Sequence, residues 1–123
     1  MKNILVVEDS ESTRSMMKTI IEDLGEEYHV FEAGTGFEAL KILPAEDFSL
    51  IITDINMPDI NGIELINFVK TTPQYKDIPM IIVSTERSEE DKKRGLALGA
   101  EAYITKPFRP EDFQEKIRLV LSS

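Results

Sequence analysis

The sequence predicts an α/β fold in which a doubly wound, five-stranded parallel sheet is covered by five helices. Short apolar runs rich in Val and Ile alternate with longer segments whose apolar residues recur at helical spacing, and this β-α unit occurs five times. The first and third runs are almost continuously apolar, which is typical of strands buried on both faces of a parallel sheet. For five strands the usual doubly wound order is 2-1-3-4-5, and we expect that order here.

The composition indicates a single domain. The 123 residues, of which 41% are hydrophobic, can fill one core of ordinary size and leave no room for a second domain. We therefore expect residues 1–123 to form one domain. The net charge of −9 argues against nucleic acid or an anionic membrane as a direct partner, because both attract clustered Lys and Arg.

The absence of cysteine excludes disulfides, thiolate metal sites and cysteine nucleophiles. The apolar run near the N-terminus covers only residues 4–7, which is too short for a signal peptide or a membrane span. Together these features predict a soluble, cytoplasmic protein.

The first strand is expected over residues 4–7 and ends in Glu8 and Asp9. Ser10 is suited to cap the helix that follows, and Gly25 is suited to end it. The apolar positions of that helix are Met16, Met17, Ile20, Ile21 and Leu24.

A second, weaker strand is expected over residues 28–33, and a turn at 34–36 leads into a helix that Pro44 ends. The apolar positions of this helix are Phe37, Leu40 and Leu43. The third strand covers residues 50–53 and runs directly into Asp54. The helix after it carries Ile63, Leu65, Ile66, Phe68 and Val69.

The fourth strand is expected over residues 79–83, and Ser88 is suited to begin the next helix. We expect this helix to be weak, because it has few apolar residues and Gly95 costs about 1 kcal/mol relative to Ala. The fifth strand is expected over residues 102–105, and Pro110 opens the last helix. Its apolar face consists of Phe113, Ile117, Val120 and Leu121.

Polar side chains of different chemistry follow four of these strands. They are Glu8 and Asp9 after the first, Asp54 after the third, Ser84 and Thr85 after the fourth, and Lys106 after the fifth. Each has an ordinary explanation, since Asp often begins turns and Lys is usually exposed. Because ligands of open parallel sheets bind at the carboxyl ends of the strands, their joint occurrence there favours a common site.

The chemistry of these groups suits a hard cation and a phosphoryl group. Three carboxylates close together repel one another, and binding Mg²⁺, which prefers oxygen ligands, relieves that repulsion. A hydroxyl and an ammonium opposite them can hold the oxygens of a phosphoryl group, whose transfer depends on positioning and charge neutralisation.

In these motifs the sequence resembles the receiver domain of two-component response regulators, in its single-domain, CheY-like form without an output domain. The motifs are Val6-Val7-Glu8-Asp9, Asp54 with Met57-Pro58 and Asn61-Gly62, Val83-Ser84-Thr85, and Lys106-Pro107-Phe108. The resemblance covers the whole chain. It implies a cis Lys106–Pro107 peptide bond and a signal that reaches downstream proteins through the fourth helix, fifth strand and fifth helix.

The resemblance also assigns roles to the site residues. Asp54 would be the phosphoacceptor and would take the phosphoryl group from a phosphohistidine on a sensor kinase. Asp9, Asp54 and the backbone carbonyl of Asn56 would bind Mg²⁺, with Glu8 acting through a bound water. Lys106 would pair with the phosphoryl group.

Four further positions match residues that switch the family or limit the lifetime of its signal. Ser84 would move to bond the phosphoryl group, and Tyr103 would be the aromatic residue that swings inward. Asn56 and Glu86 match the pair that places the water for self-dephosphorylation. Thr85 departs from the small Ala often found there, which leaves the lifetime open. The expected partners are a sensor histidine kinase and a downstream target or phosphatase.

Two other functions remain open on sequence grounds. The segment from Gly34 through Gly36 to Ala39 fits a G-x-G-x-x-A dinucleotide-binding motif, with Asp54 near the distance expected of a ribose-binding acid. A Mg²⁺-dependent phosphatase or phosphotransferase could also use Asp54 as its nucleophile. Such an enzyme needs a second acid two residues later, where this chain has Asn56.

Overall fold

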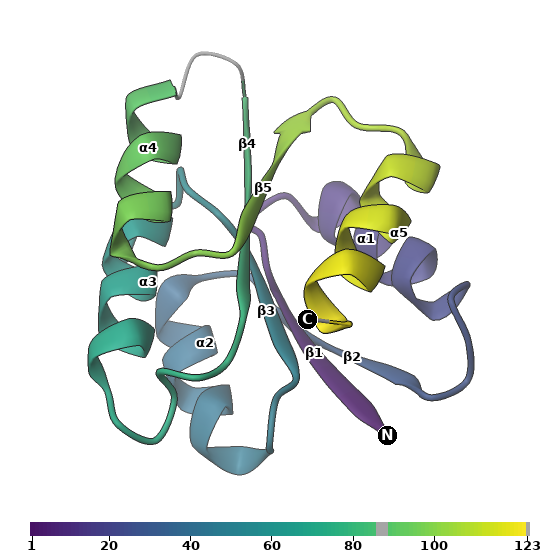
Figure 1. Ribbon diagram of the computed structural model, residues 1–123, viewed down its shortest axis with the longest axis horizontal. Coiled ribbons are helices and arrows are strands. Elements are labelled where there is room, and N and C mark those ends of the chain that lie inside the picture. Colours follow the sequence, from purple (N-terminus) through teal and green to yellow (C-terminus); the bar gives the residue numbers. More distant parts are fainter. Residues whose placement is uncertain (86–88, 123) are drawn as a thin grey trace.

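The computed structural model describes residues 1–85 and 89–122, which form one sheet with helices on both faces (Figure 1). The strands are β1 (Lys2–Val7), β2 (Tyr28–Ala33), β3 (Leu50–Asp54), β4 (Met80–Thr85) and β5 (Ala102–Lys106). The helices are α1 (Glu11–Glu22), α2 (Gly36–Ile42), the 3₁₀ turn η1 (Leu43–Ala45), α3 (Gly62–Thr71), α4 (Glu89–Leu98) and α5 (Pro110–Leu121).

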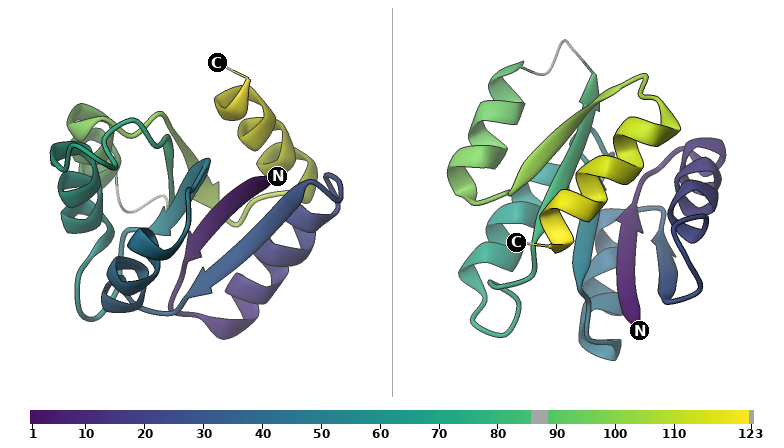
Figure 2. Two further views of the ribbon diagram at one scale, coloured as in Figure 1. Left: turned by 90° about the horizontal axis from the view of Figure 1, so that it is seen from below. Right: turned by 45° about the vertical axis from the view of Figure 1, so that its right-hand side comes forward.

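The sheet has the predicted topology. Its strands are parallel and lie in the order β2-β1-β3-β4-β5. Helices α1 and α5 cover one face, and α2, α3 and α4 cover the other (Figures 1 and 2). Because β1 and β3 are adjacent but lead to helices on opposite faces, the chain changes direction between them, and a crevice opens at their carboxyl ends.

Each face of the sheet has its own apolar core, because successive strand residues point to opposite sides. Leu5 and Ile51 face α2 and α3, whereas Ile4 and Leu50 face α1 and α5. The central strands β1 and β3 are fully buried along these residues, which explains their continuously apolar sequence.

Two helix starts agree with the prediction, that of α1 after Ser10 and that of α5 at Pro110. Ser10 caps α1 and accepts a hydrogen bond from the Thr13 N–H, as expected. Three residues assigned to apolar helix faces, Met16, Phe37 and Phe68, are instead exposed. Met16 lies at the edge of the buried stripe formed by Met17, Ile20 and Ile21, and the spacing alone does not show where such a stripe ends.

The prediction that the fourth helix is weak needs a partial correction. The residues that α4 buries are Lys92 and Gly95, whereas Leu96 and Leu98 are exposed. A Cβ atom at Gly95 would collide with the side chain of Ile82 on β4. Gly95 thus does more than weaken the helix, because it lets α4 lie close to the sheet. The expected helix start at Ser88 is outside the described residues.

Two remaining features concern the backbone and its environment. The Lys106–Pro107 peptide bond is cis, as the resemblance implies. Among the described residues, the helices are too short and too polar for one of them to cross a lipid bilayer.

Candidate functional site

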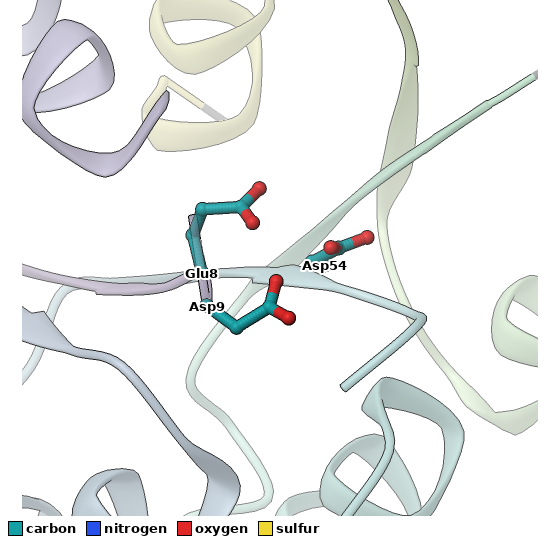
Figure 3. Close-up of side chains that lie close together, drawn as sticks. All are labelled: Glu8, Asp9 and Asp54. Carbon is teal, nitrogen blue, oxygen red and sulfur yellow. The ribbon is translucent and has the colours of Figure 1, made fainter. Parts of the chain in front are cut away.

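Three carboxylates converge where β1 and β3 end side by side. Glu8 and Asp9 follow β1, and Asp54 is the last residue of β3 (Figure 3). One carboxylate oxygen from each residue lies within 4.8 Å of the others. The parallel pairing of β1 with β3, which places Val7 opposite Thr53, brings these groups together from positions far apart in the sequence.

The cluster combines buried and exposed carboxylates. Glu8 is 1% exposed and Asp54 is 6% exposed, whereas Asp9 is exposed. Buried charges require partners, and here the partner is Lys106 at the end of β5. Its Nζ atom lies 2.7 Å from Glu8 Oε1 and 3.4 Å from Asp54 Oδ2. The structure thus brings the three acids together and places Lys106 against two of them, Glu8 and Asp54.

The environment shifts the pKa values of both members of the shortest ion pair. Burial raises the pKa of Glu8 above its ordinary value, and the nearby Asp54 adds to this effect, while the hydrogen bond from Lys106 opposes it. Burial disfavours the Lys106 ammonium, but the hydrogen bond to Glu8 and the charge of Asp54 outweigh it and raise the pKa of Lys106. The lysine therefore stays charged at neutral pH.

Ser84 supplies a buried hydroxyl at the end of β4, one residue after Val83, which pairs with Asp54. Ser84 is 1% exposed, and its Oγ atom has no hydrogen-bond partner among the described residues. A buried polar atom without a partner costs about 1–3 kcal/mol, so such atoms mark places where water or a ligand binds. Thr85, the next residue, is exposed and lies opposite Lys106 in the register of β4 and β5.

Asn56 lies in the loop that follows Asp54. It is exposed, and its backbone N–H donates to Asp54 Oδ1 at 3.4 Å. The residue predicted to act with it, Glu86, is outside the described residues.

Tyr103 on β5 is 40% exposed, and its ring lies next to Lys92, a residue that the sequence analysis did not identify. Lys92 of α4 is 3% exposed, and its Nζ atom lies 5.1 Å from the centre of the Tyr103 ring and 3.0 Å from Thr105 Oγ1. Because lysine is almost never fully buried, composition gives no reason to expect this contact. The one available signal was its position three residues before Gly95, on the face of α4 that meets the sheet.

Asp59 is a second residue that sequence reasoning did not identify. From the loop between β3 and α3, its Oδ1 accepts a hydrogen bond from Gly36 N at 3.1 Å, and its Oδ2 accepts one from Phe37 N at 2.9 Å. The hydrogen bond from Phe37 is the main reason that the pKa of Asp59 lies below its ordinary value.

These contacts argue against the dinucleotide-binding alternative. A phosphate bound at a glycine-rich turn needs free backbone N–H groups at the start of the helix. Here Gly36 and Phe37 donate to Asp59, and Gly34 donates to Glu38 Oε2 at 2.9 Å. The chain's own carboxylates thus occupy the positions where the phosphate would bind.

The residues present at the sheet edge fit a hard divalent cation. The candidate ligands are carboxylate oxygens from three residues, close enough to share one ion, and the exposed Asp9 leaves one side open to solvent. Mg²⁺ binds through one or two carboxylates and retains several waters, which matches such a partly open site. A Mg²⁺ ion held there would also reduce the repulsion between the three acids.

Comparison with known proteins identifies the family. The model of the family described as "Response regulator receiver domain" matches residues 4–118. The chain belongs to this family. Receiver domains are signalling domains that accept a phosphoryl group in two-component systems, and CheY-like receivers interact with histidine kinases and downstream targets.

Individual relatives match nearly the whole chain. A chemotaxis protein CheY homolog of Campylobacter jejuni is 40% identical over 98% of this chain and 92% of its own length. The aerobic respiration control protein ArcA of Escherichia coli is 39% identical over 98% of this chain but only 48% of its own length. The structure of the chemotaxis response regulator CheY4 of Vibrio cholerae superposes with a TM-score of 0.89 at 38% identity, covering 98% of both chains.

The raised pKa of Glu8 predicts how the stability of this receiver domain depends on pH. The folded state keeps a proton on Glu8 at pH values where the unfolded chain, with its ordinary value of 4.5, has lost it. The free energy of unfolding should therefore contain a contribution that falls as the pH rises from the unfolded to the folded pKa. Metal-free urea denaturation of the wild type and Glu8→Gln across this range should show that contribution only in the wild type.

Glu46→Gln, which removes an exposed carboxylate outside the cluster, serves as the control and should keep the wild-type pH dependence. A pH dependence of Glu8→Gln that equals that of the wild type would contradict the assignment.

Proposed function

We propose that Asp54 is the phosphoacceptor of this receiver domain. The observation that carries the proposal is the position of its carboxylate, which lies at the end of a buried strand, 3.4 Å from Lys106 Nζ and within 4.8 Å of carboxylate oxygens of Glu8 and Asp9. In the transfer, a carboxylate oxygen of Asp54 would attack the phosphorus of a phosphohistidine on a sensor kinase. The product would be an acyl phosphate, and the histidine nitrogen would leave.

The other residues at the sheet edge would bind the cation and the phosphoryl oxygens. Asp9, Asp54 and the backbone carbonyl of Asn56 would hold Mg²⁺, with Glu8 acting through a bound water. When bound, Mg²⁺ neutralises negative charge on the phosphoryl group. Lys106 already lies within reach of Asp54 and would move from its carboxylate to a phosphoryl oxygen.

Ser84 would recognise the phosphorylated state. Its Oγ atom is buried and unpartnered within the described part of the chain, so a hydrogen bond to the new phosphoryl oxygen would replace no existing one. Thr85 would border the acyl phosphate and restrict the access of water. Asn56 and Glu86 would place the water that hydrolyses the acyl phosphate, and the protein would catalyse only its own phosphorylation and dephosphorylation.

Through β4 and β5, movement at Ser84 would reach the surface formed by α4, β5 and α5, where partner proteins would bind. Ser84 pairs with Thr105, and Thr105 accepts a hydrogen bond from Lys92 beneath the exposed Tyr103. Inward rotation of Tyr103 would change the surface formed by α4, β5 and α5. A pocket of about 370 Å³ on this surface is lined by Tyr103 and by residues of the β5–α5 segment.

This surface would contact the downstream protein target or a phosphatase, and the sensor kinase would approach the carboxyl edge of the sheet. Because the phosphohistidine donor is formed from ATP, we also propose that the protein acts in the cytoplasm. A Mg²⁺-dependent phosphatase is less well supported, because the residue two positions after Asp54 is Asn56, which cannot protonate a leaving group.

Phosphorylation can be tested without the kinase. Incubation with acetyl phosphate and Mg²⁺ should add one phosphoryl group to the wild type, measured by intact mass, because the site itself provides the catalytic groups. Asp54→Asn should abolish the adduct. Asp23→Asn, at the end of α1 that is remote from Glu8 and Asp9, should leave the adduct unchanged. An unmodified wild type, or an undiminished adduct on Asp54→Asn, would contradict the proposal.

Signal transmission predicts where the structure responds. Phosphorylation should change amide hydrogen exchange most between residues 88 and 108, because this segment carries α4 and β5, and α4 has few apolar contacts that resist movement. Mass-spectrometric exchange with and without acetyl phosphate measures the change, and Asp54→Asn under the same conditions is the control. A uniform change, or none in this segment, would count against the proposed switch.

A further inference from the structure

The loop between β3 and α3, residues 55–61, is attached to the start of α2 by one side chain. Both carboxylate oxygens of Asp59 are used, each accepting a backbone hydrogen bond from α2. Asp59 is exposed, so packing in the core does not hold its side chain in place, and these hydrogen bonds do. A bidentate contact of this kind fixes the orientation of the loop as well as its distance from the helix.

The same loop lies directly against the backbone of α2. A Cβ atom on Gly36 would lie 2.7 Å from the carbonyl oxygen of Ile60 and 2.6 Å from its Cβ atom. This approach leaves room only for glycine. Asp59 therefore secures a contact that is already tight, and the two segments cannot shift past each other without breaking its hydrogen bonds.

The two ends of the loop are also held near the strand. Gly62 N donates to Ile55 O at 2.8 Å, and a side chain at Gly62 would collide with the carbonyl oxygen of Asp54. Asn61 and Glu64 form a capping box that begins α3. Between these attachments lies Asn56, whose backbone carbonyl is a proposed Mg²⁺ ligand.

We propose that Asp59 is a positioning residue for the metal and phosphoryl site, an inference that rests on the proposed function. By attaching the loop to α2, it holds the Asn56 peptide in one orientation before the cation arrives. Mg²⁺ requires near-ideal octahedral geometry at about 2.0–2.1 Å, so a displaced carbonyl ligand weakens binding. Without Asp59 the loop would have to become ordered when Mg²⁺ binds. The free energy needed to order it would lower the affinity for Mg²⁺.

A neighbouring residue provides a matched control. Glu38 also accepts a backbone hydrogen bond at the start of α2, from Gly34 N at 2.9 Å, and it too is exposed. In the described part of the chain, the hydrogen bonds of Glu38 are with Gly34 and Thr35, and neither reaches the loop. Glu38→Ala therefore removes a similar hydrogen bond from the same helix and leaves the loop attached.

The test is a Mg²⁺ titration without any phosphoryl donor, followed by NMR shifts of backbone amides near Asp54. Asp59→Ala should raise the half-saturating Mg²⁺ concentration by about tenfold, the scale typical of residues that orient metal ligands. Asp59→Asn, which keeps one acceptor oxygen, should give an intermediate value. Glu38→Ala should match the wild type. In acetyl phosphate reactions, saturating Mg²⁺ should bring the phosphorylation rate of Asp59→Ala most of the way back to that of the wild type.

An unchanged Mg²⁺ midpoint in Asp59→Ala would overturn the proposal, as would an equal increase in Glu38→Ala, because the effect would then follow from helix stability alone. Urea denaturation of both variants shows whether their stabilities are comparable. A wild type that binds Mg²⁺ but accepts no phosphoryl group would contradict the proposed function, while the titration would still decide the role of Asp59.

Discussion

The chemistry of the site depends on the repulsion between like charges that are crowded at one edge of the sheet. Glu8 and Asp54 are almost completely buried, and with Asp9 they place three carboxylates within reach of one cation. Lys106, which β5 brings across the sheet edge, balances part of this charge. The remaining repulsion makes the site receptive to Mg²⁺, because a divalent cation lowers the energy of the whole cluster. Phosphoryl binding would use the same positive charges.

Much of this arrangement could be predicted from the sequence, because it follows from local patterns. Apolar runs locate the strands, the β-α alternation fixes their parallel order, and a polar residue after each strand must lie at the carboxyl edge. For this reason Asp54 and Lys106 could be placed in one site although they are far apart in the chain. The family resemblance then added roles that spacing alone cannot supply.

Lys92 and Asp59 could not be predicted, because their contacts depend on how separate elements pack. Lys92 is buried where Gly95 allows α4 to lie against β4, and its contacts with Thr105 and Tyr103 reach across to β5. Asp59 appears in the sequence as an ordinary loop carboxylate, yet it binds the start of α2, a helix that lies before β3 in the chain. Both residues connect the sheet edge to neighbouring elements, where a change at Asp54 would be transmitted.

We propose that the acids at the carboxyl ends of β1 and β3 form one cation site. Mn²⁺ takes the same hard oxygen ligands as Mg²⁺, and its unpaired electrons broaden the NMR signals of nearby nuclei. At low Mn²⁺ concentrations, the amide signals around Glu8, Asp9, Asp54 and Asn56 should broaden first and should recover when excess Mg²⁺ displaces Mn²⁺. Broadening spread evenly over the acidic surface, or centred away from these residues, would contradict the account.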